Sequence, residues 1–414
     1  MKTQSAPHSL ITILTLVLTI VIDIMGLGLI FPLLSTLFLG KDALLVHSAV
    51  DLATRHWMYA LVVAVWPLGI FLGAPYFGKL SDKYGRKRLL QGCLVGTAGA
   101  YVLSAVGVVL HSYTIFLISR FISGYFAGSF EIAQAAITDV STPANKVRNL
   151  AFITFSTTAG IMLGPALTGL TAGWQILSWP YVTTPLLVAA ALSLLNVVSV
   201  SVLFKETYHN RLNIKVPLTA ALTSCLVLFQ DKRVRRLGGA FFFQQLGYGF
   251  YMMALPIMLA QLFHWSIRLQ GWFFSSAGLC MVLAMILIQP ILLKRFTMRS
   301  NYLVLVTVET LLFVVLVIWP NPTNQWWVFD STAVVQLIGY SCLLVMISNA
   351  VSEHEQGAIL GGAGSAYGIS QIITGLVIGP LLTISLRLPL ILVAICVFIS
   401  VLIMFSIRQP TRSE

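Results

Sequence analysis

The chain has 414 residues, of which 58% are hydrophobic and 9% are charged. A soluble domain carries about 25% charged residues, so this composition excludes a water-soluble protein and indicates an integral membrane protein. The formal net charge of +12 would suit a nucleic acid partner, but the basic residues lie in the connections between apolar stretches. We therefore expect a lipid bilayer, and no nucleic acid, as the partner of this chain.

Twelve apolar stretches follow one another along the chain. About 20 helical residues cross a bilayer core of about 30 Å, and the stretches reach that length. They cover approximately residues 9–38, 57–79, 89–110, 112–138, 149–173, 178–204, 237–263, 269–293, 301–320, 331–350, 357–384 and 388–407. The first stretch lacks a small-residue cleavage site, so we interpret it as a membrane span and not as a signal peptide. The sequence predicts an all-α integral membrane protein with twelve transmembrane helices.

Lysine and arginine residues concentrate in alternate connections between the stretches. One side of the membrane receives Lys2, residues 78–88, Lys146, Arg148, residues 205–236, Lys294, Arg295, Arg299, Arg408 and Arg412, and the other side receives Lys41, Arg55, Arg268 and Arg387. Basic residues of a membrane protein stay on the cytoplasmic side. We therefore expect a multi-pass protein of the cytoplasmic (inner) membrane with both termini in the cytoplasm.

The residue types that mark metal sites and catalytic sites are scattered. The five cysteines form no CxxC pair, and the seven histidines show no HxxxH or HExxH spacing. We expect free thiols, no metal site and no cofactor. No Ser/His/Asp set indicates an enzyme, and no GxxxxGK[ST] loop indicates ATP as the direct energy source.

The longest polar interruption, residues 205–236, separates six stretches from six. It predicts a cytoplasmic linker between an N-terminal six-helix bundle, residues 1–204, and a C-terminal six-helix bundle, residues 237–414. The middle of the linker, Pro217–Gln230, is predicted to form a short helix at the membrane surface.

The two halves share local sequence. The fifth stretch reads GIMLGPALTG (160–169) and the eleventh reads GLVIGPLLTI (375–384), while LSDKYGRKR (80–88) after the second stretch has a degraded copy, LLKRFTMRS (292–300), after the eighth. These matches, each six stretches apart, indicate a parallel internal repeat of two pseudo-symmetric bundles. Such repeats are typical of transporters with one central site between two halves that rock against each other.

The stretch GKLSDKYGRKR (78–88) resembles the loop motif of the major facilitator superfamily. The resemblance implies a latch between the two halves in the outward-open state, with the start of the eleventh stretch as one partner. Its expected residues are Gly78, Asp82, Gly85, Arg86 and Asp139. The alternative is that the lysines and arginines of this stretch only anchor the chain on the cytoplasmic side.

Further motifs resemble the twelve-span drug:proton antiporters of that superfamily, which are similar to multidrug and tetracycline efflux proteins. They are the RxxxGxxxG of Arg120–Gly128, the spacing of Asp23 and Pro32, and the GxxxGPxxGG-like pattern of Gly160, Gly164, Pro165 and Gly169. Thr168 replaces a glycine of the last pattern, and Ala151 stands where a further upstream glycine is usual.

Four charged residues lie within the apolar stretches: Asp23, Arg120, Glu131 and Glu309. A charge at the bilayer centre costs about 2.5–3.5 kcal/mol, so these residues are functional candidates. The depths of Asp23 and Arg120 differ by roughly 6 Å, which predicts a buried interaction between them. Glu131, eleven residues after Arg120, should share its helix face.

We expect Asp23, Arg120 and Glu131 to couple transport to protons. The alternative for Arg120 is that it bonds backbone carbonyls and braces two helices. Glu309 lies in a stretch that is peripheral in this family, which favours a packing or lipid-edge role.

Aromatic and amide side chains suggest the wall of a substrate cavity. The candidates are Tyr125, Phe130, Gln134, Gln245, Tyr248 and Tyr251. Such a surface suits a small lipophilic or amphipathic organic molecule. The alternative is that these side chains face lipid or neighbouring helices.

Together these features predict a monomeric, proton-coupled secondary transporter that exports a drug or metabolite by alternating access. Three alternatives stay open: a dedicated exporter or importer of one metabolite such as a siderophore, a proton symporter, and a membrane sensor or scaffold with a transporter fold.

Overall fold

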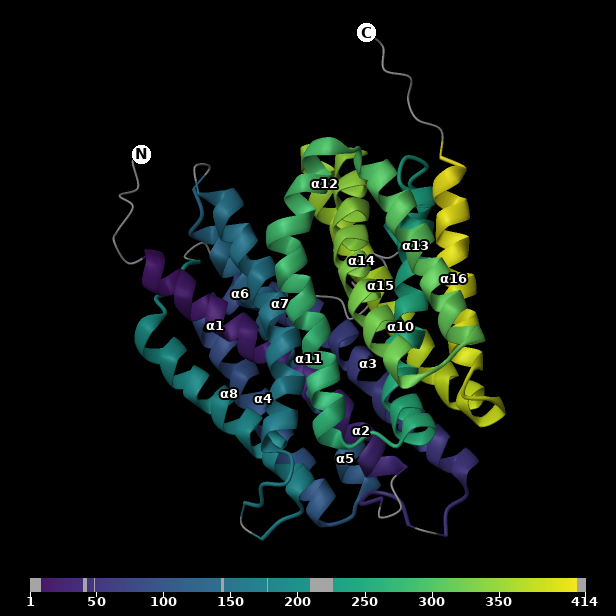
Figure 1. Cartoon of the computed structure of the whole chain (residues 1–414). Helices are drawn as coiled ribbons and strands as arrows, with labels where there is room; N and C mark the ends of the chain where they lie inside the picture. The colour runs from purple at the N-terminus through teal and green to yellow at the C-terminus, as the bar shows by residue number, and fades with distance from the viewer. Residues whose placement is uncertain are drawn as a thin grey trace. The chain divides into compact units, whose positions relative to one another are not determined.

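The computed structural model describes residues 9–39, 43–47, 49–142, 145–176, 178–208 and 226–407. These residues fold almost entirely into helices (Figure 1). Twelve helical segments of the described part are long and apolar enough to cross a membrane. The predicted all-α class with twelve transmembrane helices is confirmed.

The first six spans contain eight α-helices. These are α1 (Ser9–Gly28) and α2 (Ile30–Phe38), α3 (Leu52–Tyr84), α4 (Arg86–Val109), α5 (Tyr113–Phe126) and α6 (Ser129–Asp139), α7 (Lys146–Thr171) and α8 (Thr184–Leu203). Spans one and four each consist of two helices in sequence, because a turn at Leu29 separates α1 from α2 and a turn at 127–128 separates α5 from α6.

The last six spans contain seven α-helices. These are α10 (Arg235–Phe263), α11 (Ile267–Leu283) and α12 (Gln289–Arg295), α13 (Met298–Ile318), α14 (Pro322–Asn349), α15 (Glu353–Ile384) and α16 (Leu388–Phe405). A π-helical segment, Ala284–Ile288, joins α11 to α12. The tenth span starts earlier than predicted, because Asn321 caps α14 by accepting a hydrogen bond from the Asn324 backbone N–H at 2.8 Å.

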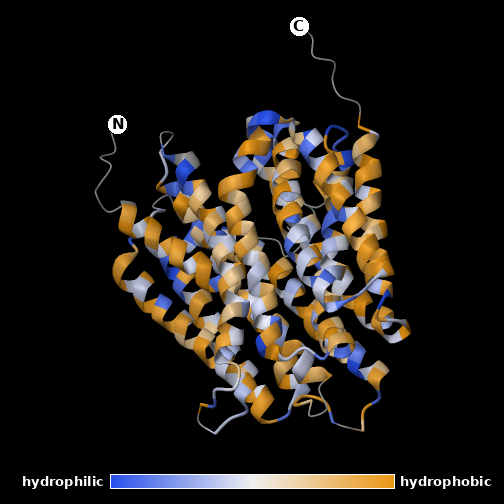
Figure 2. Cartoon of the chain, in the orientation of Figure 1, coloured by the Kyte–Doolittle hydropathy of each residue, from blue (hydrophilic) through white to orange (hydrophobic). Residues whose placement is uncertain are grey.

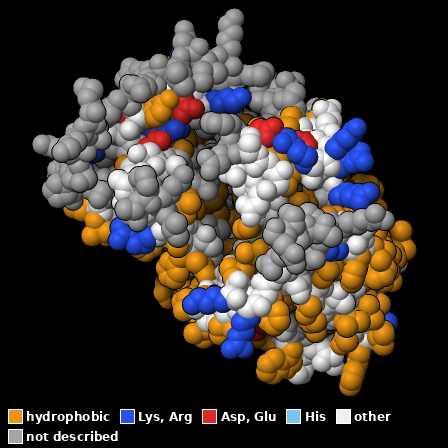
Figure 3. All heavy atoms as spheres, turned by 90° about the horizontal axis from the view of Figure 1, so that it is seen from above, with side chains coloured by type: hydrophobic (Ala, Val, Ile, Leu, Met, Phe, Trp, Pro, Cys, Tyr) orange, Lys and Arg blue, Asp and Glu red, His pale blue; other side chains and the backbone are white. Residues whose placement is uncertain are grey.

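The helices expose apolar side chains, as membrane helices do. On α13 an apolar stripe with helical spacing is exposed, formed by Val304, Val308, Leu311, Val315 and Ile318. In water such a stripe would mark an interaction site, but it suits lipid tails along the whole helix. Figure 2 shows the helices mainly hydrophobic along their length, with hydrophilic residues toward their ends. Figure 3 shows basic side chains and a few acidic ones on the face viewed from above.

The chain divides into two compact units. Unit 1 comprises residues 1–51, 65–218 and 264–278, and unit 2 comprises residues 52–64, 219–263 and 279–414. Each unit therefore includes the first part of one helix, α11 or α3, that belongs to the other half of the sequence. The prediction divided the chain into a bundle of residues 1–204 and a bundle of residues 237–414. It did not anticipate that residues 52–64 group with unit 2 and residues 264–278 with unit 1.

Glycines allow the exchanged segments to pack closely. In unit 1, a Cβ on Gly271 of α11 would lie 2.7 Å from Gly169 Cα of α7. In unit 2, a Cβ on Gly379 of α15 would lie 2.8 Å from Ala60 Cβ of α3. Real Cβ contacts are not this short, so only glycine permits this approach of the helices.

Part of the predicted linker helix falls outside the described residues. Residues 226–230 are helical, whereas residues 217–225 lie outside the described part. Six basic residues and one cysteine assigned from the sequence also lie outside it: Lys2, Lys41, Arg211, Lys215, Cys225, Arg408 and Arg412.

Candidate functional site

The first candidate site lies where α3 ends and α4 begins, in unit 1. α3 ends at Tyr84, and α4 starts at Arg86. Gly85 between them has φ +98°, a backbone conformation that L side chains rarely adopt. Gly78 is different: it lies within α3, and a Cβ there would meet nothing within 4 Å among the described atoms. The expected tight turn therefore depends on Gly85 and not on Gly78.

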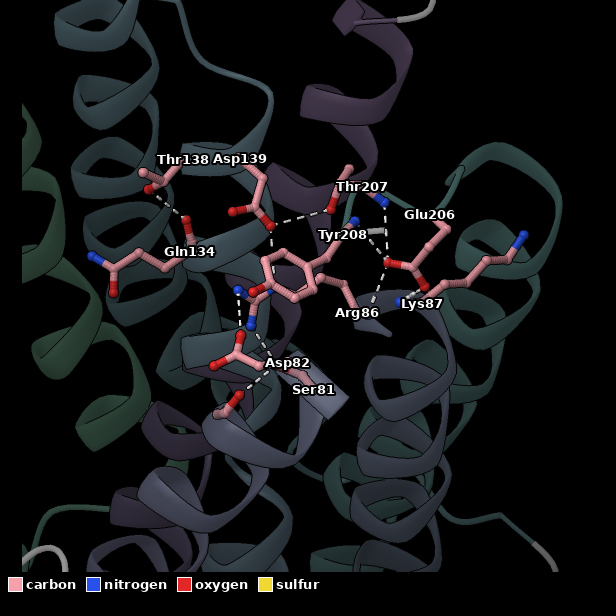
Figure 4. Close-up of polar contacts among 11 residues, drawn as sticks. Ser81, Asp82, Arg86, Lys87, Gln134, Thr138, Asp139, Glu206, Thr207 and Tyr208 are labelled. Carbon is pink, nitrogen blue, oxygen red and sulfur yellow. Dashed lines mark hydrogen bonds and ion pairs between the residues drawn. The ribbon is translucent and has the colours of Figure 1, made fainter. Parts of the chain in front are cut away.

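Arg86 is the centre of this site (Figure 4). Its guanidinium pairs with Asp82 at 2.7 Å and with Asp139, the last residue of α6, at 3.1 Å. It also donates to the Ser81 hydroxyl and lies 5.0 Å from the centre of the Tyr208 ring. Arg86 is 7% exposed, whereas the Asp139 side chain is 22% exposed. The contact between Arg86 and Asp139 that the resemblance implied is therefore present and partly buried. The docking of Asp82 on the eleventh span stays a prediction.

Glu206, which follows α8, completes the site. Its carboxylate accepts hydrogen bonds from the backbone N–H groups of Arg86 at 2.9 Å and Lys87 at 3.1 Å, and from those of Thr207 at 3.0 Å and Tyr208 at 3.1 Å (Figure 4). The first N–H groups of a helix lack partners within it. Because Gly85 has no side chain to cap α4, Glu206 caps this helix from 120 residues away in sequence.

Sequence analysis missed Glu206. The sequence did contain a signal for it: Glu206 is an acid beside Lys205, directly after the sixth stretch. It is predicted to lie on the same side of the membrane as residues 78–88. An acid in that place can serve a helix N-terminus that has glycine as its N-cap. The site therefore joins the loop after α3, the end of α6 and the start of the linker within unit 1.

The second group of candidates is Asp23, Arg120 and Glu131. Among the described residues Asp23 and Arg120 form no ion pair, and Asp23 Oδ2 and Arg120 Nη1 are buried without hydrogen-bond partners. The predicted direct interaction is therefore wrong. The Arg120 guanidinium lies 5.9 Å from the centre of the Trp66 ring, close enough for a cation–π contact.

Glu131 does not continue the face of Arg120. The turn at 127–128 ends one helix and starts another, so an eleven-residue spacing no longer sets the relative direction of the two side chains. Arg120 is 3% exposed, whereas Glu131 is exposed. The shared face expected from the sequence is wrong for this reason.

The antiporter-like pattern lies on α7 and packs against α1. A Cβ on Gly160 would lie 2.7 Å from Ile24 Cβ, and one on Gly164 would overlap the backbone near Met25. Thr168, the departure from the family pattern, donates its hydroxyl to the Leu29 carbonyl at 2.7 Å. That carbonyl lies at the turn between α1 and α2, so Thr168 compensates a backbone group at the helix interruption.

Three cavity candidates lie in unit 1. Tyr125, Phe130 and Gln134 are all half-buried. The Tyr125 ring stacks on Tyr76 and Phe121, with centroids 6.4 Å and 6.3 Å away. The Tyr125 ring therefore packs against other aromatic rings of the same unit.

The other three lie on α10 in unit 2. Tyr248 is half-buried. Gln245 is 3% exposed and accepts a hydrogen bond from Gln336 of α14. Tyr251 is fully buried, 4.9 Å from the Phe313 ring centre, which places it in the core of the unit rather than on an open surface.

Two further acids lie inside unit 2. Glu309 of α13 is fully buried, and neither carboxyl oxygen has a hydrogen-bond partner in the part of the chain that is described. A lipid-edge position for Glu309 is therefore wrong. Asp330 was missed, because the tenth stretch was expected to start after it; α14 starts at Pro322 and includes it.

Comparisons with known proteins agree with this architecture. The family model described as Major Facilitator Superfamily matches residues 16–343 and 237–414. The tetracycline resistance protein, class G, of Vibrio anguillarum is 27% identical over 85% of each chain, and class C of Escherichia coli is 26% identical over 87% of each. The crystal structure of the human organic anion transporter MFSD10 (TETRAN) is similar with a TM-score of 0.72 and 18% identity, over 96% of this chain and 100% of the other.

Family and fold both describe transporters and not enzymes. The family model covers nearly the whole chain, the described part holds twelve membrane-spanning helices, and the relatives match over most of their length. This chain is thus a member of the major facilitator superfamily, a multi-pass membrane protein that works as a secondary transporter of small molecules.

Proposed function

We propose that this protein exports a small lipophilic or amphipathic organic molecule in exchange for protons, as a monomer, by alternating access. The observation that carries the proposal is Asp23, a carboxyl on a membrane span with a buried oxygen that has no hydrogen-bond partner among the described residues. The Ser129 side chain hydrogen-bonds to the same carboxyl, but no cation pairs with it among the described residues. A carboxylate with a buried oxygen left unsatisfied is costly, and protonation lowers that cost. Loading and unloading a proton at Asp23 is therefore a means of biasing the conformations of the transporter.

The second observation is that Glu309 in unit 2 repeats this situation. Its two carboxyl oxygens have no partners within the described residues, and the side chain is fully buried. Each unit therefore has a membrane helix that carries an acid with a buried oxygen lacking a hydrogen-bond partner among the described residues. Two such acids give two places at which a proton gradient can act.

The direction of transport and the substrate class are supported by the relatives. Two relatives that match over most of the chain are named for resistance to tetracycline, an organic antibiotic. Export is the way in which a membrane transporter confers such resistance. A half-buried aromatic cluster around Tyr125 suits the same class of molecule.

We also propose that both termini are cytoplasmic and that the protein resides in the inner membrane. The distribution of lysine and arginine between alternate connections supports this orientation. Cysteine labelling from outside intact cells tests it: a cysteine at Arg55 should react, and one at Lys232 should react only after permeabilisation.

The experiment on function uses everted membrane vesicles with an imposed inside-acid gradient and tetracycline as the probe. Exchange predicts accumulation that stops when the gradient is dissipated and is lost in Asp23→Asn. Proton-driven loss of preloaded tetracycline would identify a symporter and overturn the proposal. Full gradient-driven accumulation in Asp23→Asn would remove Asp23 from coupling.

A scaffold or sensor role is separated by the same assay. A chain without transport would show no difference between energised and de-energised vesicles for tetracycline or for a second probe, ethidium. Thermal unfolding of the purified protein with each probe reports binding independently of transport.

A further inference from the structure

Asp23 and Arg120 do not contact each other, although each has a buried polar atom without a hydrogen-bond partner in the described structure. Burying two charged side chains costs free energy unless each has a polar group close by. One polar side chain that lies near both would lower the cost for each of them. The side chain in that position is Tyr101 of α4. It is 3% exposed and lies close enough to interact electrostatically with both Asp23 and Arg120.

The Tyr101 hydroxyl is located by its contact with α1. A Cβ added at Gly26 would overlap this hydroxyl, so only a glycine leaves room for it. Gly26 is three residues after Asp23, which places it on the same face of α1, one turn away. The hydroxyl therefore reaches α1 beside the carboxyl.

On its other side, Tyr101 lies beside α5. The Ser123 hydroxyl is its neighbour there, and Ser123 follows Arg120 by three residues on the same helix face. The phenol thus lies between the helix turn that carries Asp23 and the helix turn that carries Arg120.

The register between α4 and α5 is held next to Tyr101. Ser104, one turn after Tyr101, shares a hydrogen bond of 2.7 Å with Ser119, the residue before Arg120. Both serines are fully buried. This contact keeps the phenol and the guanidinium at the same depth.

We propose that the Tyr101 hydroxyl links Asp23 to Arg120, as a positioning residue for the proton-carrying carboxyl. A phenol can donate one hydrogen bond and accept others. Small shifts of the side chains allow it to donate to the Asp23 carboxylate while its oxygen accepts from Arg120. The link favours the charged form of Asp23 and weakens when Asp23 is protonated, because a neutral carboxyl accepts a weaker hydrogen bond. Arg120 thus responds to the proton through Tyr101. This inference rests on the proposed role of Asp23.

Few other titratable groups face Asp23. Within the elements packed against α1, helices α7 and α8 carry only Lys146 and Arg148, both at the start of α7, and α6 carries Glu131 and Asp139. From α4, Cys93 also interacts with Asp23. Tyr101 is the group in this set that interacts with both Asp23 and Arg120.

The test measures protonation of Asp23 directly. Infrared spectra of the full-length protein in liposomes are recorded across pH, and the protonated-carboxyl band missing from Asp23→Asn is assigned to Asp23. Tyr101→Phe removes the donor to the carboxylate and should move the midpoint of this band upward by about one pH unit. Tyr181→Phe, which changes an exposed tyrosine of the same unit, should leave it in place.

A second variant protects the test against a folding defect. Gly26→Ala keeps the phenol but displaces it, and should shift the midpoint in the same direction. An unchanged midpoint in Tyr101→Phe, or in Gly26→Ala if Tyr101→Phe does not fold, overturns the link.

The two proposals can fail separately. Gradient-driven transport that requires Asp23, with an unchanged midpoint in Tyr101→Phe, would overturn only the role of Tyr101. A shifted midpoint without proton-coupled transport would overturn only the proposed function.

Discussion

Removing the carboxylate of Glu206 should destabilise unit 1 measurably. The carboxylate accepts hydrogen bonds from the first two N–H groups of α4 at 2.9 Å and 3.1 Å. Loss of an N-cap acceptor costs about 1 kcal/mol, and loss of a negative charge at a helix N-terminus adds about 0.3–1 kcal/mol. Because Glu206 is half-buried, we expect Glu206→Ala to cost about 1.5–2 kcal/mol. For a unit of about 200 residues this corresponds to a fall of about 3–8 °C in Tm.

Two matched variants separate the sources of this effect. Glu206→Gln keeps an acceptor but loses the charge, so its Tm should fall by only about 1–4 °C. The gap between wild type and Glu206→Gln should narrow in about 1 M salt, where charges are screened within about 3 Å. Thr207→Ala is the control, since the Thr207 hydroxyl makes only a long contact of 3.4 Å with Asp139.

The assay is thermal unfolding of the purified protein in detergent, followed by tryptophan fluorescence. A Tm of Glu206→Ala within about 1 °C of wild type would refute the capping role. Equal losses in Glu206→Gln and Glu206→Ala would show that the charge, and not the acceptor, carries the stability.

Three further outcomes follow from the contacts. Arg86→Ala leaves two partly buried carboxylates without their cation, so it should lower the free energy of unfolding by about 2–3 kcal/mol. It should also increase the labelling of a cysteine placed at the end of α6. Unchanged Tm and labelling would contradict this. Gly271→Leu should lower Tm strongly, because a side chain has no space at that position. The control Gly92→Leu should leave Tm nearly unchanged, because a Cβ there would meet nothing within 4 Å among the described atoms. Similar falls in Tm for both variants would contradict the close packing at Gly271. Hydrogen bonds from Arg233 lower the pKa of Asp231. The stability that this pair contributes is therefore present above about pH 4 and is lost as pH falls through the lowered pKa. The Tm difference between wild type and Arg233→Ala should shrink at acidic pH, and a difference that grows there would contradict the assignment.

The number and class of the membrane spans could be predicted from the amino-acid sequence. A bilayer sets the length of an apolar helix, and its polar boundaries mark the ends, so hydropathy is nearly sufficient. The turn at Gly85 was also accessible, because a short motif with a required glycine encodes it locally. The contact between Arg86 and Asp139 spans 53 residues and was accessible only through the family resemblance.

Other features arise only when distant segments meet. Glu206 caps α4 across 120 residues, and no local pattern identifies such a partner. Asp23 and Arg120 were expected to pair from their depths alone, but depth does not fix the rotation of a helix, and Tyr101 from a third helix lies beside both. Glu131 was misplaced because helical periodicity assumes an unbroken helix, and the turn at 127–128 interrupts it.

The membrane thus determines where the transmembrane helices lie through the hydrophobic length of each segment. This length is a local property that the amino-acid sequence gives directly. The polar contacts inside the units depend on which faces of the helices meet, and packing of small residues such as Gly26 and Gly164 decides this. The proposed proton binding at Asp23 depends on this second kind of information, because the surroundings of a carboxyl come from several helices at once.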